Sequence, residues 1–423
     1  MNPVIVIPSY WDADDSPRAL GERGIYDHTT PIDRPVPELE TCLASLDKVR
    51  GVMRVIVLLV APAAHERAAR ARVEGICRQH PRLNILLVGS PEADLVSRAV
   101  LSVGRGVGSE AAALRGYGAI RNMGLLVAGA LGHDVVVFMD DDEVAESPDF
   151  LIDAVYGLGM RSHANTKIVA KTGYFVDRDG SPYASGHVAW RDRAWSKHEG
   201  FNAWMRRALD EKGPRITRSN VCCGGCMALH AEAFTTVPFD PWITRGEDLD
   251  YLINLRLCGI DEWFDSGWSV RHLPPPTPSI PSRFMQDAYR WTYEAAKLAH
   301  ANTLIETTKV APESLDPYPG PWLRPNVGER IARTAFRRAI ASRDRLDYLR
   351  IMRRGRTSAE GYAAEHVTGY APLMAAWRRV AATLWEDEEL ARGLVRLGTP
   401  RAPEPGKTSS WMELGGGNLG GDL

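Results

Sequence analysis

The sequence predicts an α/β fold in which helices flank a mostly parallel sheet. Its 423 residues are 44% hydrophobic and 25% charged, a composition typical of a folded chain of about two to three domains. The first third alternates short, β-rich apolar runs with segments of helical periodicity, as βαβ units do. The run at 135–139 ends abruptly in Asp140-Asp141-Asp142-Glu143, and open α/β sheets bind ligands beyond the carboxyl ends of their strands.

Short apolar runs predict the strands of the first part of the chain, and the segments between them predict its helices. The expected strands are Pro3–Pro8, Val52–Val60, Asn84–Val88 and Val135–Met139. Apolar residues recur near the helical period in Glu38–Val49 and in Ala63–Gln79, and a third helix fits Glu110–Leu131. Residues 1–143 are therefore expected to form one half of an α/β domain.

The rest of the chain is expected to be mixed and then helical. Strands are predicted at Lys167–Val176 and Trp268–His272, within a second half at 144–275. The prolines at 274–276 cannot continue a helix or a central strand, so they mark a boundary. Residues 276–400 are expected to be a helical extension, with periodicity over Arg283–Glu306 and Gly328–Arg354. The glycine-rich residues 401–423 lack the apolar surface that offsets ordering entropy and are expected to be a disordered tail.

Charge and hydropathy exclude several classes of function. The 51 Lys and Arg residues nearly cancel the 53 Asp and Glu residues, so the chain as a whole offers no strong field for nucleic acid. The longest apolar runs, Val55–Ala64 and Val135–Met139, are shorter than the ~20 residues of a membrane span. Met1 leads directly into an apolar run without a basic segment, which argues against a secretory signal. With six cysteines mostly in strand-like or helix-like contexts, a cytoplasmic location is expected.

The acidic cluster is the strongest chemical signal. Adjacent carboxylates repel one another unless a cation neutralises them, which favours a divalent metal site at 140–143. The alternative is a solvated acidic loop that caps the following helix through Ser147 and Asp149.

Several further motifs follow one another in a specific order. They are Pro8-Ser9-Tyr10, Arg121-Asn122, Asp140-x-Asp142, Gly224-Gly225, Glu247-Asp248 and His272. In this order the sequence resembles the GT-A glycosyltransferases, which transfer sugars from nucleotide-diphosphate donors. It is most similar to the large inverting glycosyltransferase family 2 and to its retaining phosphoglycerate-glycosylating relatives, so the stereochemical outcome stays open. The resemblance covers about residues 3–275. It implies a Rossmann-like mixed sheet flanked by helices, with a nucleotide-binding half at 1–143 and an acceptor half at 144–275.

The resemblance also implies a donor site and a metal site. Donor nucleotide contacts are expected from Pro8, Ser9, Tyr10, Arg121, Asn122, Asp140 and Asp141. The metal, Mn²⁺ or Mg²⁺, is expected at Asp140, Asp142 and His272, with Asp142 the more direct ligand. The family's second strand usually ends in an aspartate that reads the base, but the strand that ends at Val60 has none. The sequence therefore leaves UDP and GDP open.

Glu247-Asp248 matches the acidic pair at which inverting members of the family place their general base. Such a base must reach the acceptor hydroxyl on the sugar face opposite the leaving diphosphate. Asp248 is the candidate for this role. Both residues would also stabilise a helix N-terminus, and the two roles are compatible.

Acceptor contacts are expected at Gly224 and Gly225, where the backbone can approach a ligand. Trp190 and Trp242 are candidate platforms for a sugar, with core packing as the alternative. The cysteines at 222, 223 and 226 lack the second pair of ligands that structural zinc needs. The glycine-rich stretch 104–108 is expected to be a mobile loop over the donor site.

The sequence therefore favours a metal-dependent glycosyltransferase with a nucleotide-diphosphate sugar as donor and a hydroxyl compound as acceptor. Whether the acceptor is anionic or lipid-linked stays open. The Arg-rich segment 330–356 is by default interpreted as a solvated face, and whether it contacts a membrane peripherally also stays open. One alternative is a sugar nucleotidyltransferase, although its glycine- and arginine-rich loop is missing after the first strand. Another is a non-catalytic sugar-nucleotide or glycan-binding protein, and fold alone does not decide among these functions.

Overall fold

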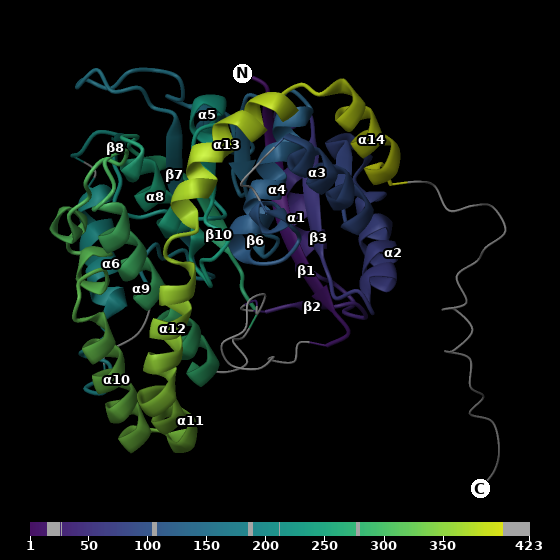
Figure 1. Cartoon of the computed structure of the whole chain (residues 1–423). Coiled ribbons are helices and arrows are strands. Elements are labelled where there is room, and N and C mark those ends of the chain that lie inside the picture. Colours follow the sequence, from purple (N-terminus) through teal and green to yellow (C-terminus); the bar gives the residue numbers. More distant parts are fainter. Residues whose placement is uncertain are drawn as a thin grey trace, which may run out of the picture.

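The structure, a computed structural model, has a mixed sheet at its centre, helices on both of its faces and a group of C-terminal helices beside it (Figure 1). It describes residues 1–14, 26, 28–103, 108–184, 189–210, 212–275 and 280–400. The predicted helix-flanked mixed sheet and the C-terminal helices are confirmed. The expected tail at 401–423 and most of the glycine-rich stretch 104–108 lie outside the described residues.

The sheet has ten strands in the described part of the chain, eight of them in the order β4-β3-β1-β5-β9-β7-β10-β6, with β2 pairing with β1 and β8 with β10. The strands are β1 (Pro3–Asp12), β2 (Thr30–Pro31), β3 (Val55–Val60), β4 (Ile85–Val88), β5 (Val135–Phe138), β6 (Glu143–Val144), β7 (Ala170–Val176), β8 (Ile216–Arg218), β9 (Met227–His230) and β10 (Trp263–His272). The strands from β4 to β5 are parallel, whereas β9 runs antiparallel to both of its neighbours.

Burial on both faces explains why the first strands are continuous apolar runs. Val4 and Val6 of β1 pack into one core cluster, and Ile5 and Ile7 pack into the cluster on the other side of the sheet. A strand covered by helices on both faces needs apolar side chains at every position. Because β1 and β5 pair in parallel, their carboxyl ends point to the same end of the sheet.

Helices cover both faces of the sheet and form the C-terminal group. They are α1 (Glu38–Leu46), α2 (Glu66–Cys77), α3 (Ser90–Val103), α4 (Tyr117–Ala130), α5 (Phe150–Val155), α6 (Lys197–Ala208), α7 (Ala231–Phe234), α8 (Glu247–Leu257), α9 (Ile280–Ala301), α10 (Val327–Ala341), α11 (Arg345–Arg350), α12 (Arg356–His366), α13 (Tyr370–Leu384) and α14 (Glu388–Gly398). Single turns of 3-10 helix lie at Pro81–Leu83, Ser109–Ala111, Pro312–Leu315 and Gly320–Trp322, and a π-helical turn lies at Ile351–Gly355.

The structure divides two of the predicted helices. Glu110–Leu131 was expected to be one helix, but α4 begins at Tyr117, directly after Gly116, whose φ is +82°. Such a φ is unfavourable for other residues and ends regular helix. Gly328–Arg354 is likewise divided, because α10 ends at Ala341 and the chain turns before α11.

Helix α8 joins the sheet to the C-terminal helices and is buried along almost its whole length. Tyr251 and Leu255 pack into a core cluster on the sheet, whereas Leu249 and Leu252 pack against residues of α9 and α10, including Trp291. Because both sides of α8 are fixed by packing, its N-terminus has a defined position at the end of the sheet.

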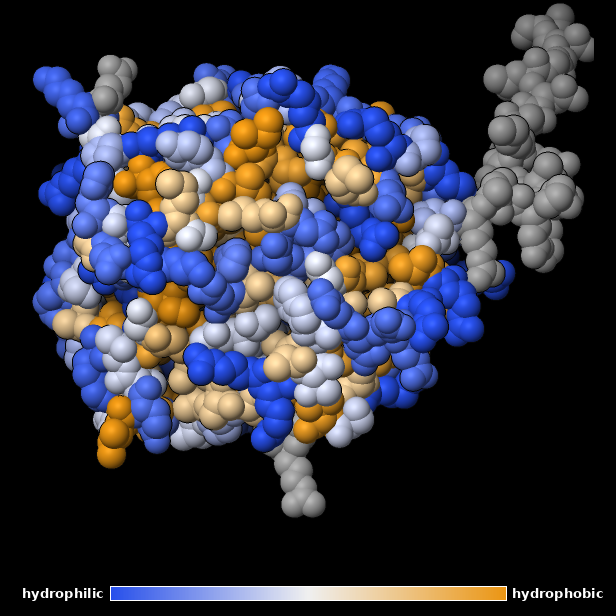
Figure 2. All heavy atoms as spheres, turned by 90° about the horizontal axis from the view of Figure 1, so that it is seen from above, coloured by the Kyte–Doolittle hydropathy of each residue, from blue (hydrophilic) through white to orange (hydrophobic). Residues whose placement is uncertain are grey.

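Within the described ranges, no helix is long and apolar enough to cross a membrane. Figure 2 shows the upper face of the molecule in the orientation of Figure 1, and this face carries several apolar areas separated by hydrophilic residues.

Candidate active site

A pocket of about 340 Å³ lies beyond the carboxyl ends of β1 and β5 and extends to the beginnings of α8 and α9. Its acidic lining residues are Asp140, Asp141, Asp142, Glu143, Glu247 and Asp248. Its basic lining residues are His28, Arg121, Arg245, His272, Arg283 and Arg290, and its aromatic ones are Tyr10, Tyr26, Tyr117 and Phe175. The pocket therefore brings together side chains from β1 and the loop after β5, from the segments around β7, β9 and β10, and from α8 and α9.

Asp142 lies against two histidines on one side of the pocket. Its Oδ2 is 3.3 Å from Nε2 of His272 and 3.6 Å from Nε2 of His28. Burial alone would raise the pKa of Asp142, but the hydrogen bond and the charge of His272 outweigh it and lower that pKa. The pKa of His272 is correspondingly raised, although burial opposes the shift. The predicted proximity of His272 and Asp142 is present, and His28 adds an imidazole that the sequence did not reveal.

Arg121 connects the acidic cluster to α8. Its Nη2 donates to Oδ1 of Asp140 at 2.7 Å, and its Nε donates to Oε1 of Glu247 at 3.1 Å. The guanidinium is 4% exposed, and its Nη1 has no hydrogen-bond partner among the described residues. Burial raises the pKa of Glu247 to about 7, although Arg121 opposes this shift. A buried guanidinium with one unused edge at a pocket is suited to bind an anion.

Asp141 and Glu143 are turned toward the protein rather than left in solvent. Asp141 Oδ2 accepts a hydrogen bond of 2.6 Å from Ser9 Oγ, and Glu143 Oε2 accepts one of 3.0 Å from the backbone N–H of Asp140. Burial raises the pKa of both carboxyls well above their usual range. A Cβ at Gly225 would lie 1.8 Å from Glu143 Oε2, so a larger residue there would require the Glu143 carboxylate to move.

Asp248 is positioned by two backbone groups at the start of α8. Its Oδ1 accepts from the N–H of Leu249 at 2.7 Å, and its Oδ2 accepts from the N–H of Gly224 at 3.2 Å. The helix begins after Gly246, which has a φ of +67° and packs against the guanidinium of Arg290. Gly224 therefore contacts a site carboxylate through its backbone, as expected for a glycine that permits close approach.

Some of the expected site residues do not line the pocket. Asn122 is completely buried, and its amide bonds the backbone of Ala111 and Phe239. Ser9 is also buried and reaches the site only through Asp141. Trp190 is 50% exposed elsewhere on the surface, and Trp242 packs against His366. The side chain of Asn122 thus connects the loops that contain Ala111 and Phe239. Neither tryptophan lines the pocket.

The pocket residues that were not predicted from the sequence include two aromatic and two basic side chains. Tyr26 and Tyr117, which were not predicted, form a cluster with Tyr10, which was, and the centroid distances are 4.1, 6.0 and 5.3 Å. Arg283 and Arg290 come from α9, where their spacing of two helical turns puts them on one face. The sequence spacing of these two arginines indicates that they share one helix face, but only the path of the chain shows that this face borders the pocket.

The three neighbouring cysteines show no arrangement of a metal site. No group of three or more His, Cys, Asp or Glu side chains in the described ranges is placed to hold an ion by itself. Cys222 instead donates to Oε1 of the buried Glu262 at 3.1 Å. Burial raises the pKa values of the thiols of Cys222, Cys223 and Cys226 well above their usual range, which disfavours the thiolate form that binds metal.

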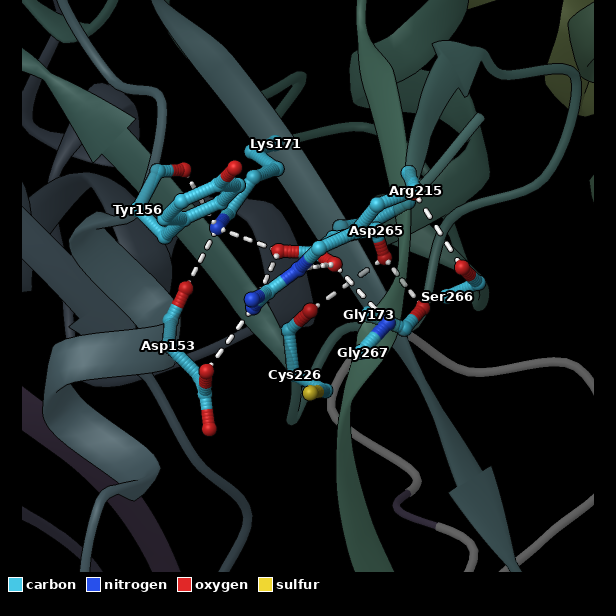
Figure 3. Close-up of polar contacts among 10 residues, drawn as sticks. Asp153, Tyr156, Lys171, Gly173, Arg215, Cys226, Asp265, Ser266 and Gly267 are labelled. Atoms are coloured by element: carbon cyan, nitrogen blue, oxygen red, sulfur yellow. Dashed lines mark hydrogen bonds and ion pairs between the residues drawn. The ribbon is translucent and has the colours of Figure 1, made fainter. Parts of the chain in front are cut away.

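A second charged group lies between β7, β10 and α5 (Figure 3). Nζ of Lys171 donates to Asp265 Oδ2 at 2.8 Å and to the carbonyl oxygens of Asp153 and Tyr156 at 2.5 and 2.8 Å. Arg215 donates to the other oxygen of Asp265 at 2.7 Å. Lys171 and Asp265 are both completely buried, and none of these residues lines the pocket. These contacts link β7 and β10 to α5 and to the residue that precedes β8.

No protein-family model matches the chain, and no curated protein matches it. The chain is similar to solved structures of glycosyltransferases. Mannosyltransferase PcManGT from Pyrobaculum calidifontis, in complex with GDP-Man and Mn²⁺, is 14% identical, with 92% of this chain and 87% of that chain covered and a TM-score of 0.41. S. aureus TarS is 11% identical, with 94% and 55% covered and a TM-score of 0.42. GalNAc-T7 with UDP, GalNAc and Mn²⁺ is 12% identical, with 78% and 57% covered and a TM-score of 0.38. At these values the likeness assigns neither a family nor a substrate to this chain.

Proposed function

We propose that the chain is a metal-dependent glycosyltransferase that moves a sugar from a nucleotide-diphosphate donor to a hydroxyl acceptor. The observation that carries this proposal is the convergence of Asp142, His272 and Arg121 on one pocket at the carboxyl end of the sheet. Carboxylate, imidazole and guanidinium groups together suit a metal-bound diphosphate. The resemblance of the sequence motifs to GT-A glycosyltransferases is consistent with binding of a metal-bound diphosphate.

The spacing of Asp142 and His272 fits ligands of one divalent cation. An octahedral ion binds ligands at about 2.1 Å, so neighbouring ligand atoms lie about 3 Å apart. The distance of 3.3 Å between Asp142 Oδ2 and His272 Nε2 is close to that separation. Because the described residues supply no complete set of ligands, diphosphate oxygens would have to complete the shell. When bound, Mn²⁺ or Mg²⁺ would neutralise the charge that develops on the departing diphosphate.

The remaining pocket residues bind and orient the donor. Arg121 lines the pocket, and its buried Nη1 has no hydrogen-bond partner within the described part of the chain, so the guanidinium retains a hydrogen bond to donate to a phosphate oxygen that enters there. Tyr10, Tyr26 and Tyr117 offer aromatic surface on which a nucleobase can stack. UDP and GDP sugars are both compatible with such a surface.

Asp248 is the proposed general base of an inverting transfer. The two backbone N–H groups that hold its carboxylate fix its orientation without neutralising its charge. It lines the same pocket as Asp142, from the start of α8 rather than from the end of β5. A carboxylate there can accept the proton of an acceptor hydroxyl while the diphosphate leaves on the other side.

A donor screen tests the proposal. Purified full chain would be incubated with UDP- and GDP-sugars and Mn²⁺, and release of nucleoside diphosphate would be followed with and without a chelator. Metal-dependent release or binding with at least one donor is expected. If no nucleotide sugar binds in the presence of Mn²⁺, the proposal is wrong.

A further inference from the structure

The helices α10 and α11 carry large apolar side chains of which half or more is exposed. Phe336 and Ile340 of α10 are 50% and 55% exposed, and Leu346 of α11 is 69% exposed. In Figure 1 these green helices extend downward to the lower end of the C-terminal group. We call the surface formed by residues 333–354 of these helices the α10–α11 tip.

The spacing on α10 shows that the exposed residues form one face. Arg333, Phe336, Arg337 and Ile340 are three, four and seven positions apart, which puts them on the same side of a helix. The opposite side is buried through Ile331, Ala335 and Ala339. The core of the protein therefore uses only the inner face of α10. A surface helix whose outer face carries large apolar residues commonly marks an interaction site.

The same surface is strongly basic. Residues 327–356 contain ten arginines and three acidic residues, Glu329, Asp344 and Asp347. The exposed arginines of the tip are Arg333, Arg343, Arg345, Arg350, Arg353 and Arg354. Only Arg350 among these six forms an ion pair with a described residue, Asp347. The local charge contrasts with the net charge of −2 of the whole chain.

We propose that the α10–α11 tip binds the surface of a membrane that contains anionic lipids. Phe336, Ile340 and Leu346 would enter the boundary between headgroups and acyl chains, and the surrounding arginines would bind lipid phosphates. This combination of basic and large apolar residues on one surface is that of interfacial membrane-binding helices. The inference is independent of the proposed transferase activity.

Other occupants fit the tip less well. A second copy of the chain would bring one set of unpaired arginines against another, and like charges at an interface disfavour association. Nucleic acid would use the arginines but not the exposed Phe336, Ile340 and Leu346. Of these three occupants, only a membrane with anionic headgroups over an apolar interior matches both the arginines and the apolar side chains.

The position of the tip also fits a membrane contact. It lies on the same lower side of the molecule as the carboxyl end of β1, where the pocket is found (Figure 1). Binding through the tip would therefore bring that side of the molecule toward the bilayer.

Sedimentation with lipid vesicles tests this inference. The full chain would be mixed with vesicles of phosphatidylcholine, with or without phosphatidylglycerol, at low and at high salt. Binding is expected with phosphatidylglycerol, and it should weaken as salt rises because the arginine contacts are screened. Absence of binding to both kinds of vesicle would overturn the proposal.

Variants separate the tip from the rest of the surface. Phe336→Ser, Ile340→Ser and Leu346→Ser combined should abolish binding, and Arg353→Gln with Arg354→Gln should weaken it by about fivefold for each charge removed. Ile305→Ser, at a site that is 96% exposed, and Arg392→Gln on α14 are the matched controls and should bind as the wild type does. Circular dichroism and thermal unfolding would check that each variant is folded.

The remaining outcomes each contradict the inference. Vesicle binding that the triple serine variant retains would place the contact elsewhere. Concentration-dependent dimerisation without vesicle binding would assign the tip to a second copy of the chain. Salt-dependent binding of RNA without binding of lipid would assign it to nucleic acid.

Discussion

The imidazole Nε2 of His272 lies 3.3 Å from Oδ2 of Asp142. The sheet explains this contact, because β10 pairs with β6 in a register that sets His272 opposite Glu143. The last residue of β10 is thereby fixed beside the acidic loop that follows β5. Burial opposes the charged form of each side chain, yet their contact lowers the pKa of Asp142 and raises that of His272. A bound cation would replace the proton of the imidazole.

Nucleotide binding should depend on a divalent metal and on Asp142. Without a cation, the carboxylates of Asp140 and Asp142 would repel the phosphates of the donor. Asp142→Ala is expected to weaken metal-dependent binding of the nucleoside diphosphate by about a hundredfold or more. Calorimetry with Mn²⁺ and with a chelator measures the effect.

Asp149→Ala is the control for this experiment. Asp149 follows the cluster closely but forms an ion pair with Arg50 and does not line the pocket. Its removal should leave the affinity unchanged. Equal affinity of the wild type with and without chelator would exclude the metal assignment.

Glu262 should make the folded state less stable as the pH rises. Burial raises the pKa of Glu262 to about 8, from an ordinary value of 4.5. Between these values the unfolded chain has released a proton that the folded chain retains, so stability decreases as pH increases. The free energy of unfolding of the wild type, relative to Glu262→Gln, should fall by about 3 kcal/mol between about pH 5 and about pH 8.

Urea unfolding at both pH values gives this difference. Glu365→Gln, at a side chain that is 73% exposed, should show no such dependence on pH. Parallel stability curves for wild type and Glu262→Gln would show that the buried carboxyl does not retain its proton.

The buried pair of Lys171 and Asp265 should contribute strongly to stability. Asp265→Asn would leave the charge of Lys171 without its carboxylate in a completely buried position. Breaking a buried pair in this way costs about 3–5 kcal/mol. Asp261→Asn, whose partner Arg218 is 60% exposed, should cost less than about 1 kcal/mol. Chemical unfolding compares the two variants, and equal losses would contradict the assignment.

The strands of the first half were predictable because burial on both faces makes them continuous apolar runs. The helix α3 was missed, although Ser90-Pro91-Glu92 is a usable N-terminal signal. The two-residue strands β2 and β6 could not be predicted, since they are defined only by their pairing with distant strands. Local sequence carries no information on such pairing.

The acidic residues of the site were predictable, and so were Arg121 and His272, but the two arginines of α9 were not. Asp140 and Asp142 follow a buried strand directly, so their position at the sheet end could be inferred. Arg283 and Arg290 belong to the extension, outside the region of family resemblance, and reach the pocket only because α9 packs against α8. Conversely, Asn122 had the right motif but its amide is used by backbone groups of neighbouring loops.

The last prediction separates catalysis from binding at Asp248. The carboxylate of Asp248 accepts hydrogen bonds from the N–H groups of Gly224 and Leu249, not from Arg121. Asp248→Asn should therefore keep donor affinity within a small factor, while turnover falls by roughly 10²–10⁴-fold, the contribution of a positioned base. Glu365→Gln, far from the pocket lining, serves as the activity control. The anomeric configuration of the product, read by NMR, gives the decisive comparison: an inverting transfer needs a base across from the leaving group, whereas a product that keeps the donor's configuration would refute that role for Asp248 whatever the loss of rate.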